Sequence, residues 1–255
     1  MRAGEKRVGG RSLDRGQFSP GSPALPPIRG FLESSFIDWP GRLCAILFVG
    51  GCNFRCPFCH NHPLVLAPEA LPEIPFAHIL QRLTPRRKWL DGICISGGEP
   101  TLSPALPGLI GFLKDEGWAV KLDTNGSRPE VLETLLAGRL LDMVAMDVKA
   151  PLVQEAYDRC AGVQVDLARI AKSVNLLQRS GVAHEFRITV APALHGEEDI
   201  LALARQLATA GSRLKLQNFN PKTTLDPRFE GKQGFAPEEF GRLARIVAEL
   251  AGSWA

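Results

Sequence analysis

From about residue 30 onward, the chain alternates between two hydrophobic patterns. Short apolar runs rich in Val and Ile predict buried strands, and segments with apolar residues three and four positions apart predict helices. The predicted strands cover residues 43–49, 92–96, 119–124, 143–148, 184–191 and 214–219. The predicted helices cover residues 74–83, 104–116, 128–137, 166–179, 197–210 and 237–250. Strands that alternate with helices in this way predict an α/β fold with a parallel sheet.

The pattern is compatible with two ways of closing this sheet: a doubly wound open sheet, or an incomplete barrel of about six βα units. In both, ligands bind at the carboxyl ends of the strands. Each predicted strand carries or runs into a polar or glycine-rich segment: GGCNFRCPFCHN (50–61), SGGEP (96–100), DTNG (123–126), MDVKAP (146–151), FRITVAP (186–192) and QNFNP (217–221). We therefore expect these segments to converge on one site.

Composition and charge narrow the class of protein. Of 255 residues, 45% are hydrophobic and 22% are charged, which excludes a wholly disordered chain. The net charge is +3, but the first 30 residues hold six basic and two acidic residues, so the remainder carries −1. A nucleic-acid partner is therefore not expected. No run approaches the ~20 apolar residues of a membrane span, so we expect no membrane association and a cytoplasmic location.

The Gly- and Pro-rich start of the chain differs from the rest. We interpret residues 1–29 as a disordered basic tail and residues 30–255 as one domain. The Arg-rich, acid-poor composition is also compatible with a transit peptide, although a plain flexible extension fits the Gly and Pro content better.

The six cysteines do not resemble a disulfide framework. Cys52, Cys56 and Cys59 have the spacing C-x3-C-x2-C, and three thiolates on one loop can hold a metal ion or a compact cluster. Three ligands are one short of a closed zinc or ferredoxin-type site, so a Cys3His zinc site with His60 or His62 stays open as an alternative. The remaining cysteines lie in apolar runs or have no predicted role: Cys44, Cys94 and Cys160.

Two acids and an arginine also suggest a site. Asp123 and Asp147 close neighbouring predicted strands, and carboxylates that converge in a cleft must pair with cations or shift their pKa. Arg187 lies inside an apolar strand, where an unpaired charge is costly, so it should contact an acid or a cofactor. We expect His184 and His195 on the surface or in loops.

The cysteine motif followed by GGEP resembles the radical S-adenosylmethionine (radical SAM) superfamily. With SSFIDWPG, ISGGEPTL, KLDTNG and MDVKAP in this order, the chain is similar to the activating enzymes of glycyl radical enzymes, especially those of anaerobic ribonucleoside-triphosphate reductase. The resemblance covers about residues 30–221 and implies a partial (β/α)6 barrel of parallel strands. It implies an oxidoreductase with one 4Fe–4S cluster, whose open iron binds S-adenosylmethionine, and with a glycine Cα hydrogen as its target.

Site roles follow from the resemblance at the matching positions. It implies that Cys52, Cys56 and Cys59 hold the cluster and that Phe58 packs near the adenine. It implies that the backbone edge formed by Gly97, Gly98 and Glu99 meets the methionine amino group. The remaining implied residues bind a monovalent cation or the cofactor, or lie near the peptide substrate: Asp123, Thr124, Asp147, Lys149, Arg187 and Asn220. Among these, Lys149 pairs with the methionine carboxylate, and Asn220 departs from the His of some relatives.

The resemblance also implies partners. Some activating enzymes carry a cysteine-rich insertion after the first motif, but here only Cys94 lies between Cys59 and Gly97. We therefore expect an external electron donor such as flavodoxin or ferredoxin, and a large glycyl radical enzyme as the substrate. Two alternatives stay open: a radical SAM enzyme with its own small-molecule or peptide substrate, and a non-catalytic zinc-binding module.

Overall fold

The computed structural model describes residues 25–208 and 212–251. Its strands are β1 (Ile28–Ser35), β2 (Cys44–Val49), β3 (Gly92–Gly97), β4 (Ala119–Thr124), β5 (Met143–Asp147), β6 (Ala183–Val190) and β7 (Arg213–Asn218). Its α-helices are α1 (His62–Leu66), α2 (Phe76–Leu83), α3 (Leu106–Asp115), α4 (Pro129–Ala137), α5 (Gln154–Ala161), α6 (Leu167–Ser180), α7 (Glu197–Leu207) and α8 (Pro237–Ala251).

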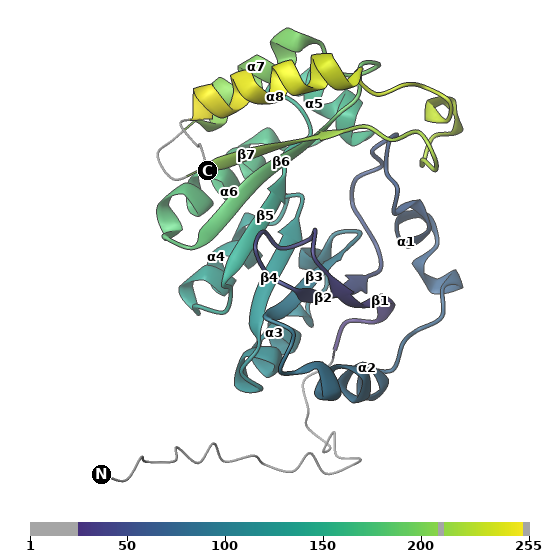
Figure 1. Ribbon diagram of the computed structural model, residues 1–255, viewed down its shortest axis with the longest axis vertical. Helices are drawn as coiled ribbons and strands as arrows, with labels where there is room; N and C mark the ends of the chain where they lie inside the picture. The colour runs from purple at the N-terminus through teal and green to yellow at the C-terminus, as the bar shows by residue number, and fades with distance from the viewer. Residues whose placement is uncertain (1–24, 209–211, 252–255) are drawn as a thin grey trace.

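The strands form one curved sheet in chain order, from β1 to β7 (Figure 1). The six strands β2 to β7 are parallel, and β1 pairs antiparallel with β2. A strand order that never reverses has no switch point, so of the two predicted closures the incomplete barrel is confirmed.

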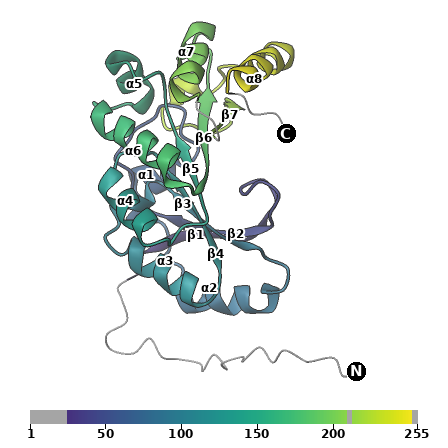
Figure 2. The same ribbon diagram turned by 90° about the vertical axis from the view of Figure 1, so that its left-hand side faces the viewer.

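The two faces of the sheet have different compositions. Alternate residues such as Leu47, Leu122 and Ile188 belong to the main hydrophobic core, and α3, α4 and α6 lie on one side of the sheet in Figure 2. The other residues, such as Lys121, Asp123 and Arg187, point to the opposite face, which we call the inner face. The amino end of this face is apolar and consists of Trp39, Cys44, Ile46, Cys94 and Met143.

Differences from the predicted elements concern short or amphipathic segments. Strand β1 was not predicted, and its first residues, Ile28 and Arg29, fall in the segment assigned to the tail. The rest of that predicted tail lies outside the described residues, apart from the segment 25–27. Helices α1 and α5 were also not predicted. No helix of the described residues has the length and hydrophobicity needed to span a membrane.

Candidate active site

The cysteine loop, residues 50–61, follows β2 at the carboxyl edge of the sheet. Three long-range backbone bonds fix it: Gly51 N to Leu64 O at 2.7 Å, Arg55 N to Ala161 O at 2.8 Å and Asp226 N to Pro57 O at 3.0 Å. A turn closed by Cys59 N and Cys56 O, 3.0 Å apart, brings the last two cysteines together. Segments far apart in the chain therefore hold the loop in place.

The three thiols of this loop are free and at least partly buried. Burial raises the pKa of Cys52 to about 11 and that of Cys56 to about 12, and it also raises the pKa of Cys59. The Lys149 ammonium acts in the opposite direction on all three thiols. A nearby cation favours the thiolate, which is the form that binds metal.

Glycines let the ends of β2 and β3 approach closely. A side chain on Gly97, whose φ is +127°, would collide with the backbone of Val49, and one on Gly98 would collide with the carbonyl oxygen of Gly51. The Asn61 side chain donates to the carbonyl of Gly97 at 3.0 Å. The segment GGEP is therefore seated directly against the cysteine loop, where only glycine fits.

Glu99 joins the ends of β3 and β4. Its buried carboxylate accepts hydrogen bonds from Thr101 N at 3.1 Å, Thr124 Oγ1 at 2.8 Å and Asn125 N at 2.5 Å. Burial raises its pKa against the effect of these donors. The Asn125 side chain in turn donates to Asn53 Oδ1 at 3.0 Å, within the cysteine loop. Sequence reasoning missed Asn53 and Asn125, although both lie inside the segments it selected.

Alternating charges cross the inner face. Lys121, fully buried, pairs with Asp123, and Arg187 lies 3.2 Å from Asp123 and 2.8 Å from Asp147. Lys149 Nζ lies 3.4 Å from the other oxygen of Asp147. Burial alone would raise the pKa of Asp147, but Arg187 and Lys149 lower it to about 2. The structure confirms that Arg187 contacts acids and that both acids are paired with cations.

His195 lies in the loop between β6 and α7, as expected, but its side chain is buried and not on the surface. Its Nδ1 accepts from Ala191 N at 3.1 Å, so Nε2 carries the proton and donates to the carbonyl of Lys149 at 2.8 Å. Burial lowers its pKa and keeps the ring neutral. The Phe58 ring packs edge-on at 6.5 Å, and Cys160 Sγ lies 3.4 Å from Nε2. His195 thus links the cysteine loop to the backbone of Lys149.

Asn220 lies beyond the end of β7, on an exposed turn. Its side chain accepts from Lys222 N at 3.2 Å, and it borders a hollow with Phe219 and Phe235. His60 stacks on Phe219 at 6.4 Å. A cofactor contact for Asn220 stays a prediction.

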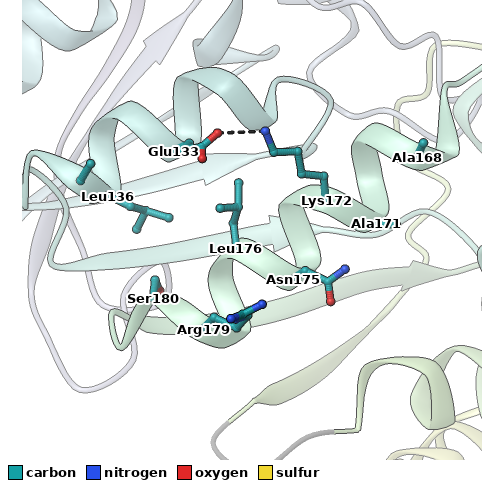
Figure 3. Close-up of a pocket in the computed structure, with 10 residues that line it drawn as sticks. Glu133, Leu136, Ala168, Ala171, Lys172, Asn175, Leu176, Arg179 and Ser180 are labelled. Carbon is teal, nitrogen blue, oxygen red and sulfur yellow. Dashed lines mark hydrogen bonds and ion pairs between the residues drawn. The ribbon is translucent and has the colours of Figure 1, made fainter.

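A groove lies away from these residues, between α4 and α6 (Figure 3). It is lined by Leu136, Leu176 and other residues and is flanked by an ion pair of Glu133 and Lys172 at 2.9 Å. None of its lining residues belongs to the cysteine loop or to the strand ends that carry Glu99, Asp123 and Asp147. We therefore assign the site to the carboxyl edge of the sheet.

The donor set of the cysteine loop fits an iron–sulfur cluster. In the described part of the chain, no three or more His, Cys, Asp or Glu side chains are arranged to hold one metal ion. An iron–sulfur cluster has a different geometric requirement from a single metal ion. Each thiolate binds a different iron, so the three sulfurs need not converge on one point. Three thiols on one loop, beside the Lys149 ammonium, meet that demand.

Comparisons with known proteins agree with this donor set. Residues 46–207 match the family model described as the Radical SAM superfamily. A Methanocaldococcus jannaschii protein that carries the name of a glycyl-radical enzyme activating enzyme is 33% identical over 230 residues, which is 86% of this chain and 91% of that protein. The pyruvate formate-lyase-activating enzyme of Staphylococcus aureus is 36% identical over 107 residues, which is 38% of this chain and 42% of that enzyme.

Solved structures share the fold. Streptococcus suis SuiB bound to its precursor peptide SuiA has a TM-score of 0.63 at 17% identity, covering 80% of this chain and 44% of SuiB. Escherichia coli coproporphyrinogen III oxidase has a TM-score of 0.57 at 13% identity, covering 81% of this chain and 51% of that enzyme. This chain spans about half or less of each, and the likeness is one of fold. From the family match and the M. jannaschii relative, the chain belongs to the radical SAM superfamily and, within it, to the glycyl-radical enzyme activating enzymes.

Proposed function

We propose that this chain activates anaerobic ribonucleoside-triphosphate reductase by removing a Cα hydrogen from one glycine of that enzyme. Membership of the radical SAM superfamily implies a 4Fe–4S cluster and S-adenosylmethionine as cofactors. The observation that carries the proposal is the placement of Cys52, Cys56 and Cys59 beside the charged inner face. Cys52, Cys56 and Cys59 would hold the cluster. Once reduced by the external donor, it would supply the electron for cleavage of S-adenosylmethionine to methionine and the 5′-deoxyadenosyl radical that would take the glycine hydrogen.

The protein's task is to bind and orient the cofactor. Gly97 and Gly98 bring their backbone close against the cysteine loop, which suits contact with the methionine amino group. Burial lowers the pKa of Lys149, but Asp147 together with Cys56, Tyr157 and Cys59 raises it above its ordinary value. The ammonium therefore stays charged and can pair with the methionine carboxylate. Phe58, fixed by His195, offers an apolar surface for the adenine.

The two acids of the inner face differ in how far neighbouring groups already occupy their carboxylates. Asp123 is occupied by Lys121, Ser96 and Arg187, and Thr124 by Glu99. Asp147 keeps 34% of its side chain exposed. We therefore assign the outward contact, with a monovalent cation or with the cofactor, to Asp147 and regard Asp123 and Thr124 as its support.

The proposal also assigns Arg187 a role toward the peptide substrate. It holds both acids of the inner face at fixed positions from β6, and its own pKa is raised by them although burial opposes this. A guanidinium with two carboxylate partners is rigid and stays charged. Such a guanidinium can position a peptide loop that reaches the inner face. It does so without transferring a proton to the peptide.

The test is anaerobic reconstitution with iron and sulfide, followed by electron paramagnetic resonance (EPR) of the dithionite-reduced protein. We expect a reduced-cluster signal that changes shape when S-adenosylmethionine is added. Mixing with the reductase and reduced flavodoxin or ferredoxin should then give a glycyl radical signal. A reductase with Ala in place of its radical glycine is the matched control and should give none.

The alternatives predict different results. A radical SAM enzyme with its own substrate would form 5′-deoxyadenosine but leave every tested reductase without a radical. A zinc module would bind stoichiometric zinc and give no iron–sulfur signal. Either result would overturn the proposal.

A further inference from the structure

Helix α5 is seated against the cysteine loop. Its last residue, Ala161, accepts the hydrogen bond from Arg55 N at 2.8 Å, directly before Cys56. The helix ends at Gly162, with φ +68°, where a side chain would collide with the carbonyl oxygen of Arg55. The last turn of α5 therefore lies in direct backbone contact with the loop.

Tyr157 lies one turn earlier on α5, four residues before Ala161 and on the same face. It is the only tyrosine of the chain and is fully buried. Among the described residues, its hydroxyl is one of two buried side-chain polar atoms without a hydrogen-bond partner. Buried polar groups are nearly always paired, so this hydroxyl requires an explanation.

The groups around this hydroxyl belong to the active site. Burial raises the pKa of Tyr157, Lys149 lowers it, and Cys56 and Asp147 raise it further. The backbone N–H of Lys149 also acts on the phenolic oxygen, without meeting hydrogen-bond geometry. The oxygen thus faces a weak donor, while its own proton has no acceptor in the described structure.

The three cysteines differ in the hydrogen bonds they accept. Cys52 Sγ accepts from Phe54 N at 3.4 Å, and the backbone N–H of Asn61 favours the thiolate of Cys59. Cys56 is the most buried of the three, and within the described residues its sulfur accepts no hydrogen bond. The Cys56 sulfur therefore lacks a hydrogen-bond donor, and the Tyr157 hydroxyl lacks an acceptor. The two groups belong to segments that the hydrogen bond from Arg55 N to Ala161 O joins.

We propose that Tyr157 donates a hydrogen bond to the cluster at its Cys56 corner, to the thiolate or to the adjoining sulfide, and so raises its reduction potential. The inference rests on the proposed function, because it requires the cluster. Sulfur bound to iron is negatively charged and accepts hydrogen bonds more strongly than a neutral thiol. Such bonds stabilise the reduced cluster, which carries one more electron.

The first experiment compares the reconstituted full chain with its Tyr157→Phe variant, without S-adenosylmethionine or partner. In an EPR-monitored redox titration, we expect the ratio of reduced to oxidised cluster at fixed potential to fall about tenfold, about 59 mV for a one-electron couple. Electron–nuclear double resonance should detect an exchangeable proton coupled to the cluster in the natural protein and not in the variant. Glu155→Gln, at an exposed position of α5, is the matched control and should keep both properties.

The single tyrosine allows a second experiment. Growth on fluorotyrosine changes only position 157, and the more acidic phenol should donate a stronger hydrogen bond and shift the potential in the positive direction. If Tyr157→Phe fails to fold, this experiment still tests whether the Tyr157 hydroxyl changes the reduction potential of the cluster. An unchanged potential with no coupled proton would overturn the role of Tyr157 and leave the proposed function intact. A natural protein that holds no cluster would overturn the proposed function itself.

Discussion

The two ends of the inner face both carry cysteines, yet their surroundings differ. At the amino end, Cys44 and Cys94 lie in strands among Trp39, Ile46 and Met143. At the carboxyl end, the cysteines of the loop lie beside Lys149 and accept backbone hydrogen bonds at two of three positions. Burial raises the pKa of cysteines at both ends, and a lysine opposes it at both ends, because Lys121 acts on Cys44 and Cys94 as Lys149 acts on the loop cysteines. The difference teaches that a nearby ammonium does not by itself make a metal site, and that the gathering of three thiols on one loop after a strand does.

The strongest test of this comparison is to replace one cysteine at each end of the inner face with alanine. Cys56→Ala should reduce the reconstituted EPR signal more than tenfold, because a cluster with two protein ligands is poorly held. Cys44→Ala should keep the signal, because its thiol lies at the amino end of the sheet, where it packs among apolar side chains and donates to the Ser35 carbonyl at 3.8 Å. Iron and sulfide analysis of both variants provides the measurement, and equal iron loss in the two would contradict the assignment of the site.

A large but purely structural effect is expected at the amino end. Trp39 is 3% exposed and covers Cys44 and Cys94. Trp39→Ala should lower the free energy of unfolding by about 3–5 kcal/mol, since it leaves a cavity in that cluster. Urea unfolding monitored by circular dichroism measures this loss. The folded fraction of Trp39→Ala should still assemble the cluster. A Trp39→Ala variant with full stability but no cluster would contradict the assignment of cluster binding to the carboxyl end.

A smaller effect concerns acid stability at the carboxyl end. The folded protein holds the pKa of Asp147 at about 2, below its ordinary value of 3.8. Its contribution is therefore present above about pH 4 and lost as the pH falls through about 2. Because a third of the side chain is exposed, we expect a loss on the order of 1 kcal/mol. Urea unfolding at several acidic pH values should show it, and Asp147→Asn should show a flatter pH dependence.

The smallest effect is expected at Asn61, which connects the loop to β3. Asn61→Ala removes the bond to the carbonyl of Gly97 and should cost about 0.5–1.5 kcal/mol. Thermal unfolding measures this cost, and faster cluster loss on exposure to a chelator should accompany it. Unchanged chelation kinetics would mean that the glycine contacts alone fix the loop.

Local patterns in the sequence predicted the parallel sheet because apolar runs and helical spacing are local signals. Strand β1 was missed since IRGFLESS mixes polar and apolar residues directly after a Gly- and Pro-rich stretch. Helix α5 was missed because QEAYDRCA is short and mostly polar. Strand β1 is defined by its pairing with β2, and α5 by its contact with Arg55, far away in the chain.

The same distinction applies to the site. The motifs predicted which segments meet, and the acids paired with Arg187 followed from the cost of an unpaired charge. The burial of His195 could not be read from the sequence, because one of its partners, the carbonyl of Lys149, lies 46 residues away in the chain. The orphaned hydroxyl of Tyr157 has the same origin, since its surroundings exist only after α5 meets the loop.

The anchoring of the cysteine loop has a consequence for the order of assembly during synthesis. Each strand pairs with its neighbour in the chain, so the sheet can grow strand by strand as the chain leaves the ribosome. The cysteines emerge early, but Ala161 and Asp226, which tie the loop down, emerge much later. Iron delivered to a nascent chain would therefore meet a loop that lacks two of its three long-range anchors, and stable loading is expected only after translation has passed α5 and the segment around Asp226.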